Sequence, residues 1–157
     1  MKIAVLGAGM VGRAMAYDLA KDFDVTSVDV CSNALSQVAA YGVKTLKSDL
    51  SDSSLVTRIA KDFDLIVCAV PGFMGYNTVK ACIGVKKSVV DISFMPEDFL
   101  ELDSLAKNAG VTVISDCGVA PGMPNIILGY HNQKMAVTDF LLHGGRVAQG
   151  AELSLPV

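Results

Sequence analysis

The chain has little charge. Only 18% of its 157 residues are Asp, Glu, Lys or Arg, against about 25% in an average soluble protein. The formal net charge is −3 and the isoelectric point is near 5.2. Basic residues are scattered, with Lys86 and Lys87 as the one adjacent pair. This pattern lacks the concentrated positive charge that binds nucleic acid or an anionic membrane surface, so we expect neither as a partner.

Several other signals are missing. No apolar run approaches the roughly 20 residues that span a bilayer, and the first residues lack the basic leader of a signal peptide, so we expect neither feature. His131 and His143 do not complete a set of metal ligands, and we expect no metal site. The four cysteines show no Cys-x-x-Cys spacing; they are Cys31, Cys68, Cys82 and Cys117. We expect free thiols in a reducing, cytoplasmic environment.

Apolar residues, in contrast, make up 52% of the chain. A parallel sheet covered on both faces explains part of this content, because its strands are apolar throughout. The remainder suggests an apolar surface that contacts another domain or a second copy of the chain. A homodimer is therefore one expectation.

The most informative stretch is the first thirty residues. An apolar run, KIAVL, leads into the turn Gly7-Ala8-Gly9-Met10-Val11-Gly12, which opens a helix-like segment. A second apolar run ends in Asp29, twenty residues after Gly9. This context of strand, glycine turn, helix and acid is that of the dinucleotide-binding fingerprint. The alternative is an ordinary βαβ unit with structural glycines.

Each position of the fingerprint has a physical role. Gly7 permits a tight turn, Gly9 permits close approach of a pyrophosphate, and Gly12 permits close packing of helix on sheet. The free N–H groups at Met10 and Val11, with the positive end of the helix dipole, then face the phosphates. Asp29 is placed to bind the ribose 2′-OH and would repel a 2′-phosphate. Because the next basic residue in the sequence is Lys44, we expect NAD rather than NADP.

Strand-like and helix-like segments then alternate along the chain, which predicts a doubly wound α/β domain with a mainly parallel sheet of the Rossmann type. We expect Ser32 or Asn33 to cap the second helix, and a helix over residues 76–83. A further helix should follow Pro96-Glu97-Asp98. The expected domains are 1–130, which binds the dinucleotide, and 131–157, the start of a truncated or absent substrate domain.

Ligands of such sheets lie at the carboxyl ends of the strands. Asp49 is a candidate for the adenine amino group, or simply an acid near a helix N-terminus. Ala69, Val70 and Pro71 are candidates to present backbone to the nicotinamide ribose, or simply end a strand. Asp116 is a candidate proton acceptor. Cys117 is either a catalytic partner of Asp116 or a small packing residue.

Together these motifs resemble the saccharopine dehydrogenase-like reductases, most of all the branch of lysine 6-dehydrogenase and saccharopine reductase. The resemblance covers about residues 1–145 and rests on KIAVLGAGMVGRAMAYDLA, SDLSDSSL, AVPGF and DCGVAPGMPN. It implies NAD(P)-dependent oxidation of a carbon that bears nitrogen in a small amino-acid substrate such as lysine. Hydride would pass to the nicotinamide and leave an imine that water hydrolyses.

The resemblance has limits. Family members continue into a substrate domain, whereas here residues 136–157 match only its expected first strand, with His143-Gly144-Gly145 at a turn. Arg146 is the remaining candidate for a substrate carboxylate, or a solvated loop charge. We therefore expect dinucleotide binding with little turnover by this chain alone. The alternative from another class is a stand-alone nucleotide-sensing module without catalysis, like those that regulate potassium transporters.

Overall fold

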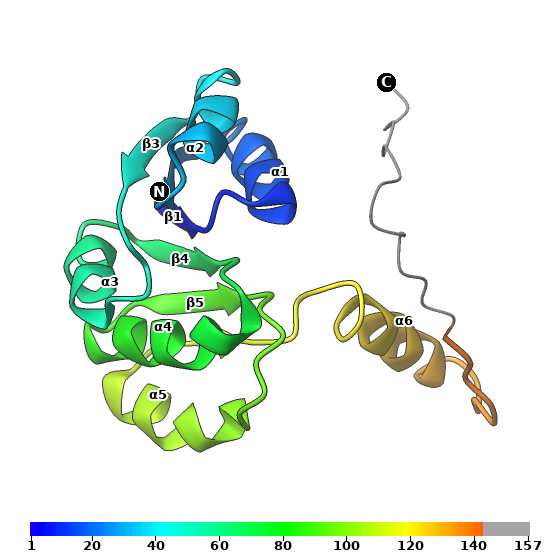
Figure 1. The fold of residues 1–157 in the computed structure, drawn as a ribbon. Helices are drawn as coiled ribbons and strands as arrows, with labels where there is room; N and C mark the ends of the chain where they lie inside the picture. The colour runs from blue at the N-terminus through cyan, green and yellow to red at the C-terminus, as the bar shows by residue number, and fades with distance from the viewer. Residues whose placement is uncertain (143–157) are drawn as a thin grey trace. The chain divides into compact units, whose positions relative to one another are not determined.

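The computed structural model describes residues 1–142 of the chain. Its centre is a six-stranded parallel sheet with the order β3-β2-β1-β4-β5-β6 (Figure 1). The strands are β1 (Lys2–Leu6), β2 (Asp24–Asp29), β3 (Lys44–Lys47), β4 (Leu65–Cys68), β5 (Ser88–Asp91) and β6 (Val113–Ile114). The helices are α1 (Met10–Leu19), α2 (Ser32–Ala39), α3 (Ser53–Ala60), α4 (Gly72–Gly84), α5 (Asp103–Ala109), preceded by the 3₁₀ helix η1 (Phe99–Leu102), and α6 (Met123–Asn132).

The strand order reverses at β1, which pairs with β2 on one side and β4 on the other. The chain thus winds outward in both directions from β1, and the loops after β1 and β4 meet at the carboxyl edge. This is the topological switch point at which open α/β sheets bind ligands. The predicted doubly wound α/β fold is confirmed.

Two apolar cores cover the two faces of the sheet. Ile3 and Val5 of β1 belong to a core that includes Ala16 of α1 and Leu35 of α2. The intervening Ala4 and Leu6 belong to the other core, with residues of α3, α4 and α5. Because side chains alternate along a strand, one apolar strand supplies both cores.

Some local expectations need correction. Cys31, not Ser32 or Asn33, is the N-cap of α2, and it makes no side-chain cap. Helix α4 begins at Gly72, four residues before the expected start at Tyr76, because Pro71 takes the N-cap position. Asp98 does cap the segment after Pro96, but this segment begins as the 3₁₀ helix η1.

The chain divides into two compact units, Met1–Gly118 and Val119–Val157. The sheet and the helices α1 to α5 lie in the first unit, and α6 lies in the second. Residues 136–142 form neither helix nor strand, so the expected strand does not begin there. His143, Gly144, Gly145 and Arg146 lie outside the described residues. The boundary at residues 130/131 stays a prediction.

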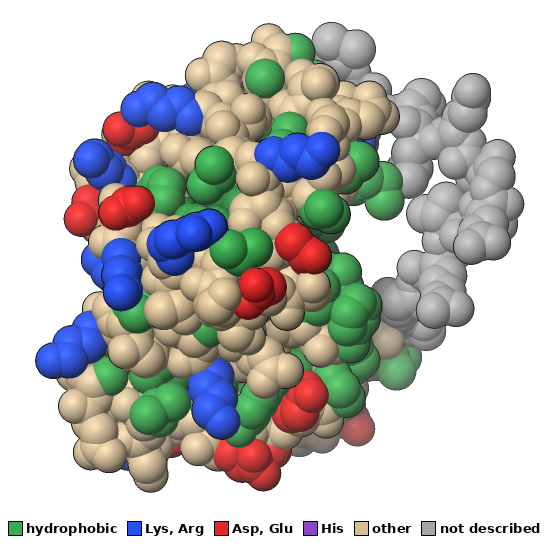
Figure 2. All heavy atoms as spheres, turned by 60° about the vertical axis from the view of Figure 1, so that its left-hand side comes forward, with side chains coloured by type: hydrophobic (Ala, Val, Ile, Leu, Met, Phe, Trp, Pro, Cys, Tyr) green, Lys and Arg blue, Asp and Glu red, His purple; other side chains and the backbone are tan. Residues whose placement is uncertain are grey.

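On the face displayed in Figure 2, basic and acidic side chains are interspersed among apolar and neutral ones. Three ion pairs occur within residues 1–142, namely Lys21–Asp18, Lys44–Asp24 and Lys107–Asp103. None of the helices in this part of the chain is long and apolar enough to cross a bilayer.

Candidate functional site

Gly7 and Gly12 of the glycine loop are required by packing. Gly7 has φ +106°, and a Cβ there would lie 2.4 Å from the carbonyl oxygen of Ala69. A Cβ on Gly12 would lie 2.0 Å from the carbonyl oxygen of Gly7. The turn after β1, the start of α1 and the end of β4 are therefore packed backbone to backbone, as the fingerprint predicts.

Gly9 differs from both. Its φ of −64° and ψ of −175° are open to any residue, and a Cβ there would meet no protein atom within 4 Å. Neither backbone strain nor packing within the described chain explains a glycine at this position. A ligand that must approach the backbone closely does explain it.

The N-terminus of α1 offers the donors for such a ligand. Gly9 is the N-cap and makes no side-chain cap, and the first turn contains no acidic residue. Arg13 N donates to Gly9 O at 3.0 Å, so the preceding N–H groups of Met10, Val11 and Gly12 lie ahead of the first helical bond. Met10 and Val11 are exposed. These groups match the anion-binding geometry of a helix N-terminus that a pyrophosphate requires.

Asp29 lies beside this loop at the end of β2. Its carboxylate accepts hydrogen bonds from Ala8 N at 2.7 Å and from Cys31 N at 2.8 Å. A carboxylate has about four acceptor sites, so the same oxygens can still accept from ribose hydroxyls. The structure thus brings together the glycine loop, through Ala8, and Asp29.

Asp49 lies at the same edge, after β3, and is exposed. Its carboxylate accepts from Ser51 Oγ at 2.7 Å and from Ser51 N at 2.9 Å. These hydrogen bonds lower the pKa of Asp49. The N-cap of α3 is Asp52, which accepts from Ser54 N at 2.8 Å. Asp49 therefore stabilises the turn before the helix, and its contact with adenine stays a prediction.

The segment Ala69–Pro71 connects β4 to α4 and borders the glycine loop. Ala69 N donates to Leu6 O at 2.8 Å, and Val70 is buried. Pro71 is exposed and is the N-cap of α4. This segment therefore ends a strand beside the glycine loop, and its contact with the nicotinamide ribose stays a prediction.

Helix α4 packs closely on the loop after β5 through two further glycines. A Cβ on Gly72 would lie 2.0 Å from the carbonyl oxygen of Phe94, and one on Gly75 would lie 2.0 Å from Ser93 Oγ. The sequence pattern does not predict this role for the two glycines. Only the fold reveals it, because their contacts lie in a loop that comes later in the chain.

Asp91 is a residue at this edge that the sequence analysis missed. It ends β5, is completely buried, and accepts from Ser93 Oγ at 2.7 Å. Within the described residues its second oxygen, Oδ2, has no hydrogen-bond partner. Burial raises the pKa of Asp91, the Ser93 hydrogen bond opposes this shift, and the charge of Asp116 adds to it. The signal was available, since an acid inside the apolar run SVVDISF is costly to bury without a purpose.

Asp116 and Cys117 follow β6 and lie near Asp91. Cys117 N donates to the carbonyl oxygen of Asp91 at 3.0 Å. Asp116 has φ +58°, an uncommon backbone conformation for a residue with a side chain. Burial raises the pKa of the Cys117 thiol, and the carboxyls of Asp91 and Asp116 raise it further. The thiol is thus held protonated, which favours its packing role over that of a nucleophile.

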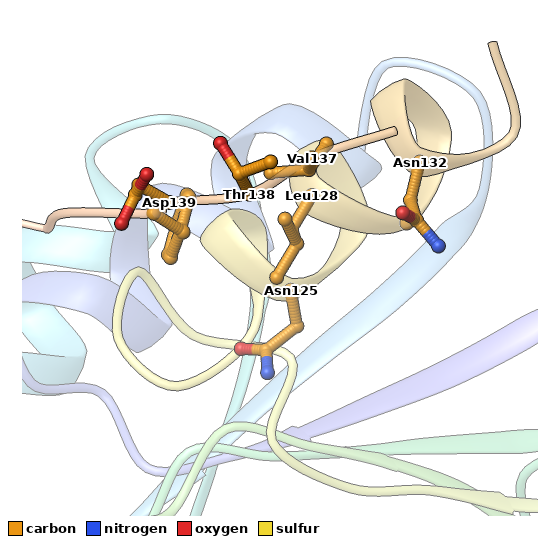
Figure 3. A pocket seen from close by; sticks show the side chains of 8 residues that line it. Asn125, Leu128, Asn132, Val137, Thr138 and Asp139 are labelled. Atoms are coloured by element: carbon orange, nitrogen blue, oxygen red, sulfur yellow. The ribbon is translucent and has the colours of Figure 1, made fainter. Parts of the chain in front are cut away.

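A separate pocket lies wholly within the second unit, between α6 and residues 137–140. Figure 3 shows Asn125, Leu128 and Asn132 of α6 beside this following segment. Asn125 Oδ1 accepts from Gly122 N at 3.1 Å and so caps the start of α6. None of the predicted site residues lines this pocket.

Comparison with known proteins identifies the family of the chain. The family model described as the saccharopine dehydrogenase NADP binding domain matches residues 3–114, and the chain belongs to this family. The chain therefore has the fold of a nicotinamide dinucleotide-binding domain of saccharopine dehydrogenase-like oxidoreductases. The recognition made from the glycine fingerprint and its companion motifs is confirmed.

Alignments with individual relatives extend beyond the residues that the family model matches. The chain is 28% identical over 127 residues to the saccharopine dehydrogenase (NADP+, L-glutamate-forming) of Saccharomyces cerevisiae, with 79% of this chain and 28% of the relative aligned. It is 24% identical over 147 residues to the carboxyaminopropylagmatine dehydrogenase of a Synechocystis strain, with 82% and 37% aligned. The chain thus spans about a third of the length of these relatives.

A solved structure has the same fold. The apo structure of saccharopine dehydrogenase (L-Glu forming) from S. cerevisiae superposes with a TM-score of 0.76 at 26% identity. The superposition covers 85% of this chain and 31% of that one.

Proposed function

We propose that this chain provides the dinucleotide-binding part of an oxidoreductase that acts on a C–N bond of a small amino-acid substrate. The observation that carries the proposal is the start of α1, where the N–H groups of Met10 and Val11 precede the first helical hydrogen bond and the side-chain position of Gly9 faces no protein atom within 4 Å. The names of the relatives, saccharopine dehydrogenase among them, support the substrate class. A bound dinucleotide would supply the hydride acceptor.

The residues of the chain divide the binding task. The N–H groups at the start of α1 hold the pyrophosphate, and Asp29 accepts from the hydroxyls of the adenosine ribose. The backbone of Ala69–Pro71 borders the nicotinamide ribose. Each of these groups is held in place by backbone contacts of the sheet edge, so little reorganisation accompanies binding.

Asp116 is our candidate for proton transfer. It follows β6 at the carboxyl edge of the sheet, half-buried and beside the thiol of Cys117. A carboxylate there can accept the proton that leaves the substrate nitrogen when the C–N bond is oxidised. Cys117, with its raised pKa, is proposed to stay a thiol and pack beside Asp116.

For the cofactor we propose a preference for NAD over NADP. The carboxylate of Asp29 lies at the end of β2, where its negative charge repels a 2′-phosphate. The family description names NADP, so the preference depends on the residues around Asp29 in this chain.

Titration calorimetry of the chain with NAD+, NADP+, NADH and NADPH tests these proposals, with lysine or saccharopine added afterwards to the binary complex. We expect saturable binding of a dinucleotide, tighter for NAD+ than for NADP+. Absence of binding by all four dinucleotides would refute the proposed function. A ternary complex with one of the amino acids would support the substrate class.

A further inference from the structure

We propose that Lys47 is a specificity-determining residue, whose ammonium group contacts the 2′-phosphate of NADP and lets this site accept NADP in spite of Asp29. The inference rests on the proposed dinucleotide-binding function and deepens it. If Lys47 has this role, the choice between NAD and NADP depends on Asp29 and Lys47, which lie on neighbouring strands.

The register of β2 and β3 carries the argument. Asp29 and Lys47 are paired residues, each the last of its strand. Ser48 N donates to the carbonyl oxygen of Asp29 at 3.0 Å, which fixes the two strand ends together. Paired strands lie about 4.8 Å apart, and paired residues point to the same face of the sheet. A phosphate on the ribose hydroxyl that Asp29 binds is therefore within reach of the Lys47 side chain.

Lys47 is available for such a contact. It is exposed, and it takes part in none of the three ion pairs within residues 1–142. The other lysine of the same strand, Lys44, is already paired with Asp24 at 2.7 Å, at the opposite end of the strand.

The charged groups near Lys47 already make hydrogen bonds within the protein. Asp29 accepts two backbone N–H groups, from Ala8 and Cys31. Asp49, two residues beyond Lys47, accepts both hydrogen bonds from Ser51. The guanidinium of Arg13 donates to the side-chain oxygen of Gln37 on α2. Of the cations around the end of β2, Lys47 is the one with no protein partner within the described residues.

The test compares Lys47→Ala with Lys44→Ala in the full chain, because both remove one positive charge from β3. Calorimetry measures the Kd of NAD+ and NADP+ for each variant, at low and at physiological salt, and circular dichroism checks the fold. We expect Lys47→Ala to weaken NADP+ roughly 5- to 10-fold and to change NAD+ less than about 2-fold. Lys44→Ala should change neither, and the salt dependence of NADP+ binding should decrease in Lys47→Ala alone.

Three results would overturn the inference. The first is an unchanged Kd for NADP+ in Lys47→Ala, and the second is an equal loss for both dinucleotides. The third is a native chain that binds NAD+ but not NADP+, because Lys47 then confers no acceptance. A native chain that binds neither refutes the proposed function itself, an outcome distinct from these three.

Discussion

The Asp29 carboxylate accepts a hydrogen bond from the backbone N–H of Ala8, inside the glycine loop, at 2.7 Å. The residue that we propose to bind the ribose thus also holds the loop that we propose to bind the pyrophosphate. Its other oxygen accepts from Cys31 N at the start of α2. The Asp29 side chain therefore links the end of β2 to the glycine loop and to the start of α2.

This arrangement predicts a cost in stability as well as in binding. Asp29→Ala removes the acceptor of two backbone N–H groups and should lower the free energy of unfolding by about 1–3 kcal/mol. Asp29→Asn keeps one acceptor oxygen and should lose less. Urea denaturation measures both changes. Equal midpoints for Asp29→Ala and the native chain would show that the two hydrogen bonds do not stabilise the fold.

Gly9 allows binding to be separated from folding. Gly9→Ala should weaken dinucleotide binding at least about 10-fold, because the methyl group occupies the side on which the pyrophosphate approaches. Its effect on unfolding should be about 1 kcal/mol or less, since Gly9 is strain-free. Gly84→Ala, also without a protein atom within 4 Å of its Cβ, is the matched control and should bind normally. Normal binding by Gly9→Ala would contradict our explanation of this glycine.

The contact between α4 and the loop after β5 predicts coupled mutations. Gly75→Ala should destabilise the protein by about 1–3 kcal/mol, because its Cβ would lie 2.0 Å from Ser93 Oγ. Ser93→Ala removes that oxygen, so the double variant should be more stable than the sum of the two single effects predicts. Thermal denaturation of all four proteins measures the coupling. Simple additivity would indicate that the two side chains do not meet.

Asp91 predicts a dependence of stability on pH. Its pKa is raised in the folded state, so the folded protein binds the proton more tightly than the unfolded chain does. Stability therefore falls as the pH rises from the unfolded pKa of about 4 through the folded pKa, and stays low above it. Asp91→Asn removes this titration.

The variant Asp91→Asn tests this pH dependence. The Tm of Asp91→Asn, relative to the native chain, should rise on the order of a few degrees between pH 4 and pH 7. Melting curves across this range, recorded by circular dichroism, measure the difference. A difference that stays constant with pH would mean that the pKa of Asp91 is the same in the folded and unfolded states.

Much of this protein follows from local sequence. The glycine fingerprint, the acid at Asp29 and the alternation of apolar runs predict the fold and the dinucleotide crevice, because each signal depends on residues that are near one another in the sequence. The predicted N-termini of α2 and α4 are less accurate, because Cys31 and Pro71, which are not ordinary capping residues, take the N-cap positions.

Contacts between residues that are distant in the sequence could be found only from the tertiary structure. The pairing of Lys47 with Asp29 depends on the register of two strands, and the need for glycine at position 75 depends on Ser93. The sequence places Asp91 inside an apolar run, but its complete burial and the hydrogen bond that it accepts from Ser93 Oγ come only from the structure. Sequence alone determined which class of cofactor the chain binds, since backbone turns are encoded locally. The fold decided which charged residues are aligned at the edge of the sheet, since parallel strands place side by side residues that the sequence separates.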